Sequence, residues 1–107
     1  MKNGNLVMIK DKDENQGVTR YIIKGRVNSK NSPVLLYAVE DALNNGENNI
    51  VLNMAQVESL SSDGIRIILK IYKKTEKAGG NFGIEEPSKN VRNILDITPL
   101  NEILIRK

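Results

Sequence analysis

Three consecutive polar residues, Ser61, Ser62 and Asp63, lie between a predicted strand and a predicted helix. Serine and aspartate often cap helices, because their side-chain oxygens accept hydrogen bonds from the free N–H groups of the first turn. The same position suits a phosphate group, because the positive end of the helix dipole stabilises an added dianion. A capping serine can also be a kinase target. The segment therefore predicts a helix cap, a phosphorylation site, or both.

The composition excludes most catalytic chemistry. The chain has no Cys and no His, which removes disulfides, the usual zinc sites, Cys nucleophiles and His-based triads. The glycine-rich residues 79–83 follow a helix and lack Lys, which indicates a turn rather than a P-loop. Glu85 and Glu86 are adjacent carboxylates that we place on the surface. We predict no catalytic residue, no metal site and no cofactor.

A row of basic residues marks the helix that follows Asp63. The formal charge of the chain is only +3, and aromatic residues make up 4%, so the stacking residues of a nucleic-acid-binding surface are missing. The row indicates either a solvated helix face or a surface for an acidic partner. Its members are Arg66, Lys70, Lys73, Lys74 and Lys77.

The length and hydropathy of the chain set its class. With 107 residues, of which 39% are hydrophobic, we expect a single globular domain over residues 1–107. No apolar run approaches the ~20 residues of a membrane span, and no secretory signal opens the chain. We expect a cytoplasmic protein without a membrane span.

The first half of the chain predicts a hairpin, a helix and a strand. Apolar residues 6–9 and β-branched residues 18–24 predict paired strands around a polar turn at residues 10–17. A helix should follow, with Ser32 as its cap, Pro33 at its first position and Gly46 at its end. The apolar residues 50–52 predict a strand buried on both faces.

The second half alternates helices and strands. The helix after Ser61 carries an apolar stripe and should end at Gly79 and Gly80, with a strand over Asn81–Glu85 next. A third helix should begin at Pro87 and Ser88, before a last strand at residues 103–105. This β-β-α-β-α-β-α-β order predicts an α/β fold with a mixed sheet and helices packed on it. The stripe consists of Ile65, Ile68, Leu69 and Tyr72, widened by Ile67 and Ile71.

Five segments, in order, resemble the STAS domain of anti-sigma factor antagonists. Residues 25–28 (Gly-Arg-Val-Asn) are similar to the turn before the first helix of the family, and residues 51–54 to its central strand. Residues 60–65 (Leu-Ser-Ser-Asp-Gly-Ile) resemble the switch loop, and Arg66 fits one of its common versions. Gly79-Gly80 resembles the small-residue turn, and residues 95–100 the signature after the third helix. The resemblance covers nearly the whole chain and implies the STAS fold.

The resemblance also implies a function in transcription regulation. An antagonist of this family binds an anti-sigma factor, often a serine kinase with a GHKL-type ATPase fold, and so frees the sigma factor. Phosphorylation of a serine in the switch loop separates the partners, and a phosphatase resets the antagonist. The implied partner-binding residues here are Asn28, Ser61, Ser62, Asp63, Gly64 and Arg66.

The sequence departs from the family at the phosphorylation site. The residue before the family's glycine is normally Ser or Thr, but Asp63 precedes Gly64 here. Ser62 or Ser61 is then the acceptor, or the protein is not phosphorylated, or Asp63 partly resembles a phosphoserine. One alternative function is a non-phosphorylated STAS subunit that docks on a transporter ATPase or another partner. A second alternative is a small nucleotide-binding module.

Overall fold

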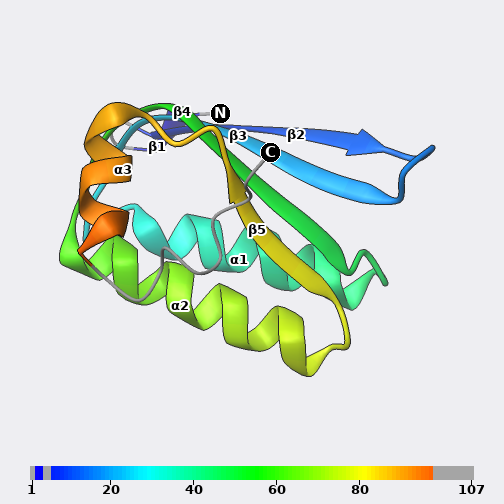
Figure 1. The fold of residues 1–107 in the computed structure, drawn as a ribbon. Helices are drawn as coiled ribbons and strands as arrows, with labels where there is room; N and C mark the ends of the chain where they lie inside the picture. Colours follow the sequence, from blue (N-terminus) through cyan, green and yellow to red (C-terminus); the bar gives the residue numbers. More distant parts are fainter. Residues whose placement is uncertain (1, 4–5, 98–107) are drawn as a thin grey trace.

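The computed structural model describes residues 2–3 and 6–97, which form an α/β fold (Figure 1). Apart from the two-residue strand β1, the elements follow the predicted order β-β-α-β-α-β-α. The last predicted strand, at residues 103–105, lies outside the described residues. The elements are β1 (Lys2–Asn3), β2 (Leu6–Asp13), β3 (Val18–Val27), α1 (Ser32–Asn44), β4 (Asn49–Leu60), α2 (Ser62–Lys77), β5 (Asn81–Glu85) and α3 (Lys89–Asp96).

The described strands form one mixed sheet in the order β1-β2-β3-β4-β5. The first three pair antiparallel, whereas β3 with β4 and β4 with β5 pair parallel. The parallel pairs arise because a helix carries the chain back before β4 and before β5. Helices α1 and α2 lie side by side along one face of the sheet, and α3 packs against β4 (Figure 1).

The β2–β3 hairpin is longer than the sequence predicted. We expected a turn over residues 10–17, but β2 continues to Asp13, which pairs with Val18. The Nζ atoms of Lys10 and Lys12 lie 3.0 and 3.1 Å from the two carboxylate oxygens of Glu47. The predicted turn was wrong because strand pairing and this distant carboxylate outweigh the polar character of the segment.

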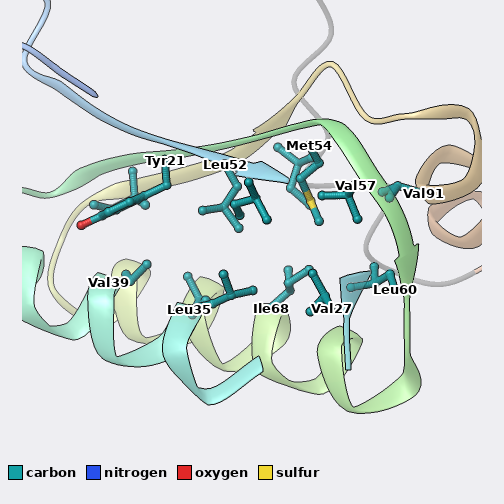
Figure 2. Close-up of a cluster of buried hydrophobic side chains, with 14 of the residues drawn as sticks. Tyr21, Val27, Leu35, Val39, Leu52, Met54, Val57, Leu60, Ile68 and Val91 are labelled. Carbon is teal, nitrogen blue, oxygen red and sulfur yellow. The ribbon is translucent and has the colours of Figure 1, made fainter. Parts of the chain in front are cut away.

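Strand β4 is buried on one face only, which corrects the prediction of burial on both. Ile50 and Leu52 point into the core, whereas Val51 between them stays half-buried. The reason is that the helices α1 and α2 cover a single face of the sheet (Figure 1). The core side chains from β3 and β4 meet those of the helices between these layers (Figure 2).

The end of β4 bends toward the helices. Its buried positions alternate up to Met54 and then fall three residues apart, at Val57 and Leu60. Its register with β3 shifts in this stretch, as expected of β-bulges, which bend a strand. Val57 lies near Val91 of α3, and Leu60 lies at the start of α2 (Figure 2). Because of this bend, the chain leaves β4 at the position where α2 begins.

The helices end as predicted. Gly46 and Gly79 adopt positive φ angles of 81° and 79° just after α1 and α2, a conformation that glycine tolerates. Ser88 caps α3 by accepting a hydrogen bond from the N–H of Val91.

None of the helices in the described part of the chain is long and apolar enough to cross a membrane.

The buried line of α2 differs in detail from the predicted stripe. It runs along Gly64, Ile68, Ile71 and Thr75. Ile71 therefore lies at the centre of the contact rather than at its margin. The other predicted members flank the line as half-buried residues: Ile65, Ile67, Leu69 and Tyr72.

Candidate partner-binding site

Ser61 caps the N-terminus of α2. Its backbone is extended, and its Oγ accepts a 3.1 Å hydrogen bond from the N–H of Gly64. Asp63 lies in the first turn, where a negative charge suits the helix dipole, so the capping role belongs to Ser61 instead. Ser62 is the first residue of α2 and is exposed. Its hydroxyl makes no hydrogen bond to the part of the chain that the structure describes.

Gly64 allows α2 to approach the sheet closely. A Cβ atom at this position would lie 2.7 Å from Cδ1 of Leu60 and 2.9 Å from Cγ1 of Val27. Both neighbours are buried, so they have little room to move. Gly64 is therefore buried beneath the predicted site. It allows the close packing on which the site rests, and it is not exposed to a partner.

The predicted turn at Asn28 lies directly beside the start of α2. The N–H of Ser61 donates a 2.9 Å hydrogen bond to the carbonyl oxygen of Val27. Val27 and Leu60 are also paired in the parallel register of β3 and β4. The ends of the two strands thus hold the Asn28 turn and the α2 N-terminus together.

The Asn28 turn is closed by its own side chains. Oδ1 of Asn28 accepts hydrogen bonds of 3.0 Å from the N–H groups of Lys30 and Asn31, and the N–H of Asn28 donates to Oδ1 of Asn31 at 2.9 Å. Ser32, the predicted cap of α1, is buried as the first residue of that helix. The prediction for Ser32 was wrong, because the asparagine side chains shape this turn.

An ion pair links Asp63 to Arg66 on the outer side of α2. Oδ1 of Asp63 lies 2.7 Å from Nη1 of Arg66, and the two side chains are 44% and 72% exposed. We refer to Asn28, Ser61, Ser62, Asp63 and Arg66 together as the α2 N-terminal surface. In the unmodified protein this surface presents a paired charge, a free serine hydroxyl and a closed turn.

A second ion pair borders this surface and was missed by the sequence analysis. Nε of Arg26 lies 3.3 Å from Oε1 of Glu58, and both side chains are exposed. The parallel register places Arg26 opposite Ser59, next to Glu58. No local pattern in the sequence signals this pairing, because it depends on the register shifts between β3 and β4.

A polar network lies on the sheet face opposite the helices. Arg20 donates two hydrogen bonds of 2.6 and 3.2 Å to the carboxylate of Glu85, which also accepts one of 2.9 Å from Nδ2 of Asn53. The hydrogen bond to Glu85 raises the pKa of Arg20. Glu85, which we placed on the surface, is half-buried with 20% of its side chain exposed, because strands β3, β4 and β5 bring these side chains together. Glu86 is exposed as predicted.

A second set of perturbed ionisable groups surrounds Glu47, which lies between α1 and β4, at the far end of the sheet from the α2 N-terminus. A hydrogen bond from Lys10, supported by one from Lys12, lowers the pKa of Glu47. The same contact raises the pKa of Lys10. Thr19 also donates a 3.3 Å hydrogen bond to Glu47. These contacts join the hairpin to the segment after α1 and have a structural role.

The arrangement at the α2 N-terminal surface suits recognition. Within residues 2–3 and 6–97, no group of three or more His, Cys, Asp or Glu side chains could hold a metal ion. The basic row along α2 is exposed, with Arg66 paired to Asp63 and Lys74 paired to Glu40 at 3.2 Å. The surface combines exposed polar groups with a backbone that is hydrogen-bonded between the two segments.

Comparison with known proteins connects this geometry to a family. The model of the STAS domain matches residues 10–107. A relative from Thermotoga neapolitana, provisionally named an anti-sigma factor antagonist, is 34% identical over 68 residues. That alignment covers 64% of this chain and 60% of the relative, so the matched part spans less than two thirds of the relative's length.

Solved structures agree with the fold. A crystal structure of a provisionally named anti-sigma factor antagonist from Thermotoga maritima has a TM-score of 0.81 and 28% sequence identity, and the match covers 91% of this chain and 82% of that one. The antagonist SpoIIAA in its unphosphorylated form gives a TM-score of 0.78 at 14% identity, with 92% and 86% of the chains covered, which shows a shared fold. By its sequence match and its fold, this chain belongs to the STAS domain family.

Proposed function

We propose that this chain acts as an anti-sigma factor antagonist and binds an anti-sigma factor through the α2 N-terminal surface. The names of the relatives support this class of activity. The observation that carries the proposal is the hydrogen bond from Ser61 N to Val27 O, which holds the Asn28 turn against the start of α2. Segments that are already held together by hydrogen bonds need less ordering on binding, which favours a specific partner.

The proposed partner is a serine kinase of the GHKL type, and Ser62 is the proposed phosphate acceptor. Ser62 is exposed, whereas Oγ of Ser61 is occupied by the N–H of Gly64. In the reaction, Oγ of Ser62 forms a bond to the γ-phosphorus of ATP, the bond to the β–γ bridging oxygen breaks, and ADP leaves. A base of the kinase takes up the hydroxyl proton. The catalytic groups belong to the kinase, so this chain is a binding protein and a substrate.

Phosphorylation would control binding through charge. The modification changes the formal charge from +3 to about +1, because a phosphate carries about two negative charges. The new charge lies within the proposed contact surface, where an acidic or apolar partner would have to desolvate it at a high cost in free energy. The complex should therefore dissociate while the domain stays folded. A phosphatase would restore the unmodified protein, and the proposed place of action is the cytoplasm.

The test combines mass spectrometry with binding. The chain is incubated with ATP and with each kinase-type anti-sigma factor of its source organism, as wild type and as the Ser62→Ala and Ser61→Ala variants. We expect one phosphate on wild type and Ser61→Ala, none on Ser62→Ala, and loss of the complex after phosphorylation. The Ser62→Ala variant should stay bound to the kinase in the presence of ATP.

Three results would contradict the proposal in different ways. Phosphate on neither serine, with tight binding in the presence of ATP, would favour a non-phosphorylated STAS subunit, such as one docked on a transporter ATPase. Absence of any complex with the anti-sigma factor would remove the antagonist function itself. Binding of labelled ATP by this chain alone would instead favour a nucleotide-binding module.

A further inference from the structure

Arg66 lies within reach of two residues of the first turn of α2. Its guanidinium now contacts Asp63, three residues earlier, at 2.7 Å. Ser62 is four residues earlier, and residues three and four apart are both neighbours on a helix surface. The Cα–Cβ bonds of a helix tilt toward its N-terminus, so the side chain of Arg66 extends back over this first turn.

We infer that phosphorylation of Ser62 transfers Arg66 from the Asp63 carboxylate to the phosphate. The inference rests on the proposed function, which supplies the phosphate. A phosphate on Ser62 would carry about two negative charges and three acceptor oxygens, against one charge on Asp63. Its oxygens match the planar fork of a guanidinium and accept two parallel hydrogen bonds. Arg66 is 72% exposed, so its side chain is free to turn.

This transfer would change what a partner meets. In the unmodified chain, Asp63 and Arg66 neutralise each other, and the guanidinium keeps donors that a partner can use. After phosphorylation, Arg66 is taken by the phosphate and Asp63 is left unpaired beside it. The partner loses a contact to Arg66 and meets two anionic groups in its place. Asp63 thus pairs with Arg66 until the phosphate replaces it.

The experiment uses phosphoserine installed at position 62 by genetic-code expansion, so that no kinase is needed. Titration by phosphorus NMR gives the second pKa of the phosphate in wild type and in the Arg66→Gln, Asp63→Asn and Lys70→Gln variants. We expect Arg66→Gln to raise this pKa by about 0.3 units or more, because a neighbouring cation favours the dianion. Asp63→Asn should lower it, because a competing anion is removed.

Two controls separate a direct contact from a general charge effect. Lys70 is exposed and lies one turn further along α2, so Lys70→Gln should change the phosphate pKa by less than about 0.1 units. The Nε–Hε signal of Arg66 should shift on phosphorylation and follow the phosphate titration with the same midpoint.

Equal phosphate pKa values in wild type and Arg66→Gln would overturn the inference. An Nε–Hε signal of Arg66 that stays unchanged during the titration would also overturn it. Because the phosphate is installed directly, either result would leave the proposed function standing. Conversely, if the kinase does not phosphorylate the chain, the proposed function is contradicted. The phosphorus NMR titration of the installed phosphoserine still tests the inference about Arg66.

Discussion

The backbone N–H of Ser61 donates a 2.9 Å hydrogen bond to the carbonyl oxygen of Val27, which joins the start of α2 to the end of β3. The bond couples two segments of the candidate site that are far apart in the sequence. Because it uses backbone atoms only, it survives substitution of either side chain. Variants at Ser61 should therefore report on the helix cap and leave the relative position of the two segments intact.

Replacement of Ser61 should destabilise the domain more than replacement of its neighbours. Ser61→Ala removes the side-chain cap and should lower the free energy of unfolding by about 1 kcal/mol. Ser62→Ala should change it by less than about 0.5 kcal/mol, since the hydroxyl is exposed. Asp63→Ala should fall between them, because it removes a surface ion pair and a dipole contact. Urea unfolding measures all three, and equal losses would show that Ser61 is not the cap.

A methyl group at position 64 should disturb the packing of α2. Gly64→Ala improves helix propensity by about 1 kcal/mol, but the added Cβ would overlap Leu60 and Val27, and overpacking costs typically 1–3 kcal/mol. We expect a net destabilisation of about 1 kcal/mol in thermal or urea unfolding. The double variant Gly64→Ala, Leu60→Val should show a favourable coupling energy relative to the two single variants. A more stable Gly64→Ala protein would mean that the core accommodates the methyl group freely.

Charge reversal at Arg66 should weaken partner binding through the association rate. Arg66→Glu places a second negative charge beside Asp63 in the proposed interface, and rim charges act mainly on encounter. We expect the association rate constant with the anti-sigma factor to fall by about tenfold at low salt, with a smaller effect at high salt. Surface plasmon resonance measures both conditions. Lys73→Glu, exposed further along α2, is the matched control; an equal effect of both variants would place the interface along the whole basic row.

The Glu47 contacts should make stability depend on pH. Lys10 and Lys12 lower the pKa of Glu47 below its ordinary value of 4.5, so the contribution is fully present above that value. It is lost as the pH falls through the lowered pKa, because the carboxylate takes up a proton. Wild type should exceed Glu47→Gln in unfolding free energy by about 1 kcal/mol at neutral pH.

The comparison at acidic pH completes this test. The difference between wild type and Glu47→Gln should shrink as the pH falls through the lowered pKa of Glu47, and it should disappear once this carboxylate is protonated. Chemical unfolding at several pH values checks this course. A difference that stays constant from neutral to acidic pH would show that hydrogen bonds of the neutral side chain, and not its charge, stabilise the hairpin.

The sequence by itself determined the helices, the glycines that follow α1 and α2, and the place of the candidate site at the start of α2. Gly46 and Gly79 end helices at positive φ, and Ser88 caps α3, because these features depend on residues within one turn of each other. The start of α2 was predictable for the same reason. Local rules predicted that Ser61, Ser62 and Asp63 lie at the start of α2. They did not show which of the three caps the helix.

The tertiary structure decided whatever depends on distant partners. Glu85 binds Arg20 across the sheet, and Glu47 extends the hairpin through Lys10 and Lys12. The apolar run in β4 predicted two buried faces, but the helices cover only one. In each case the outcome depends on strand register and on the packing of layers, which bring together residues far apart in the chain. The hydrophobic period and the secondary-structure propensity depend on one segment alone. They therefore do not show which remote residue lies opposite that segment.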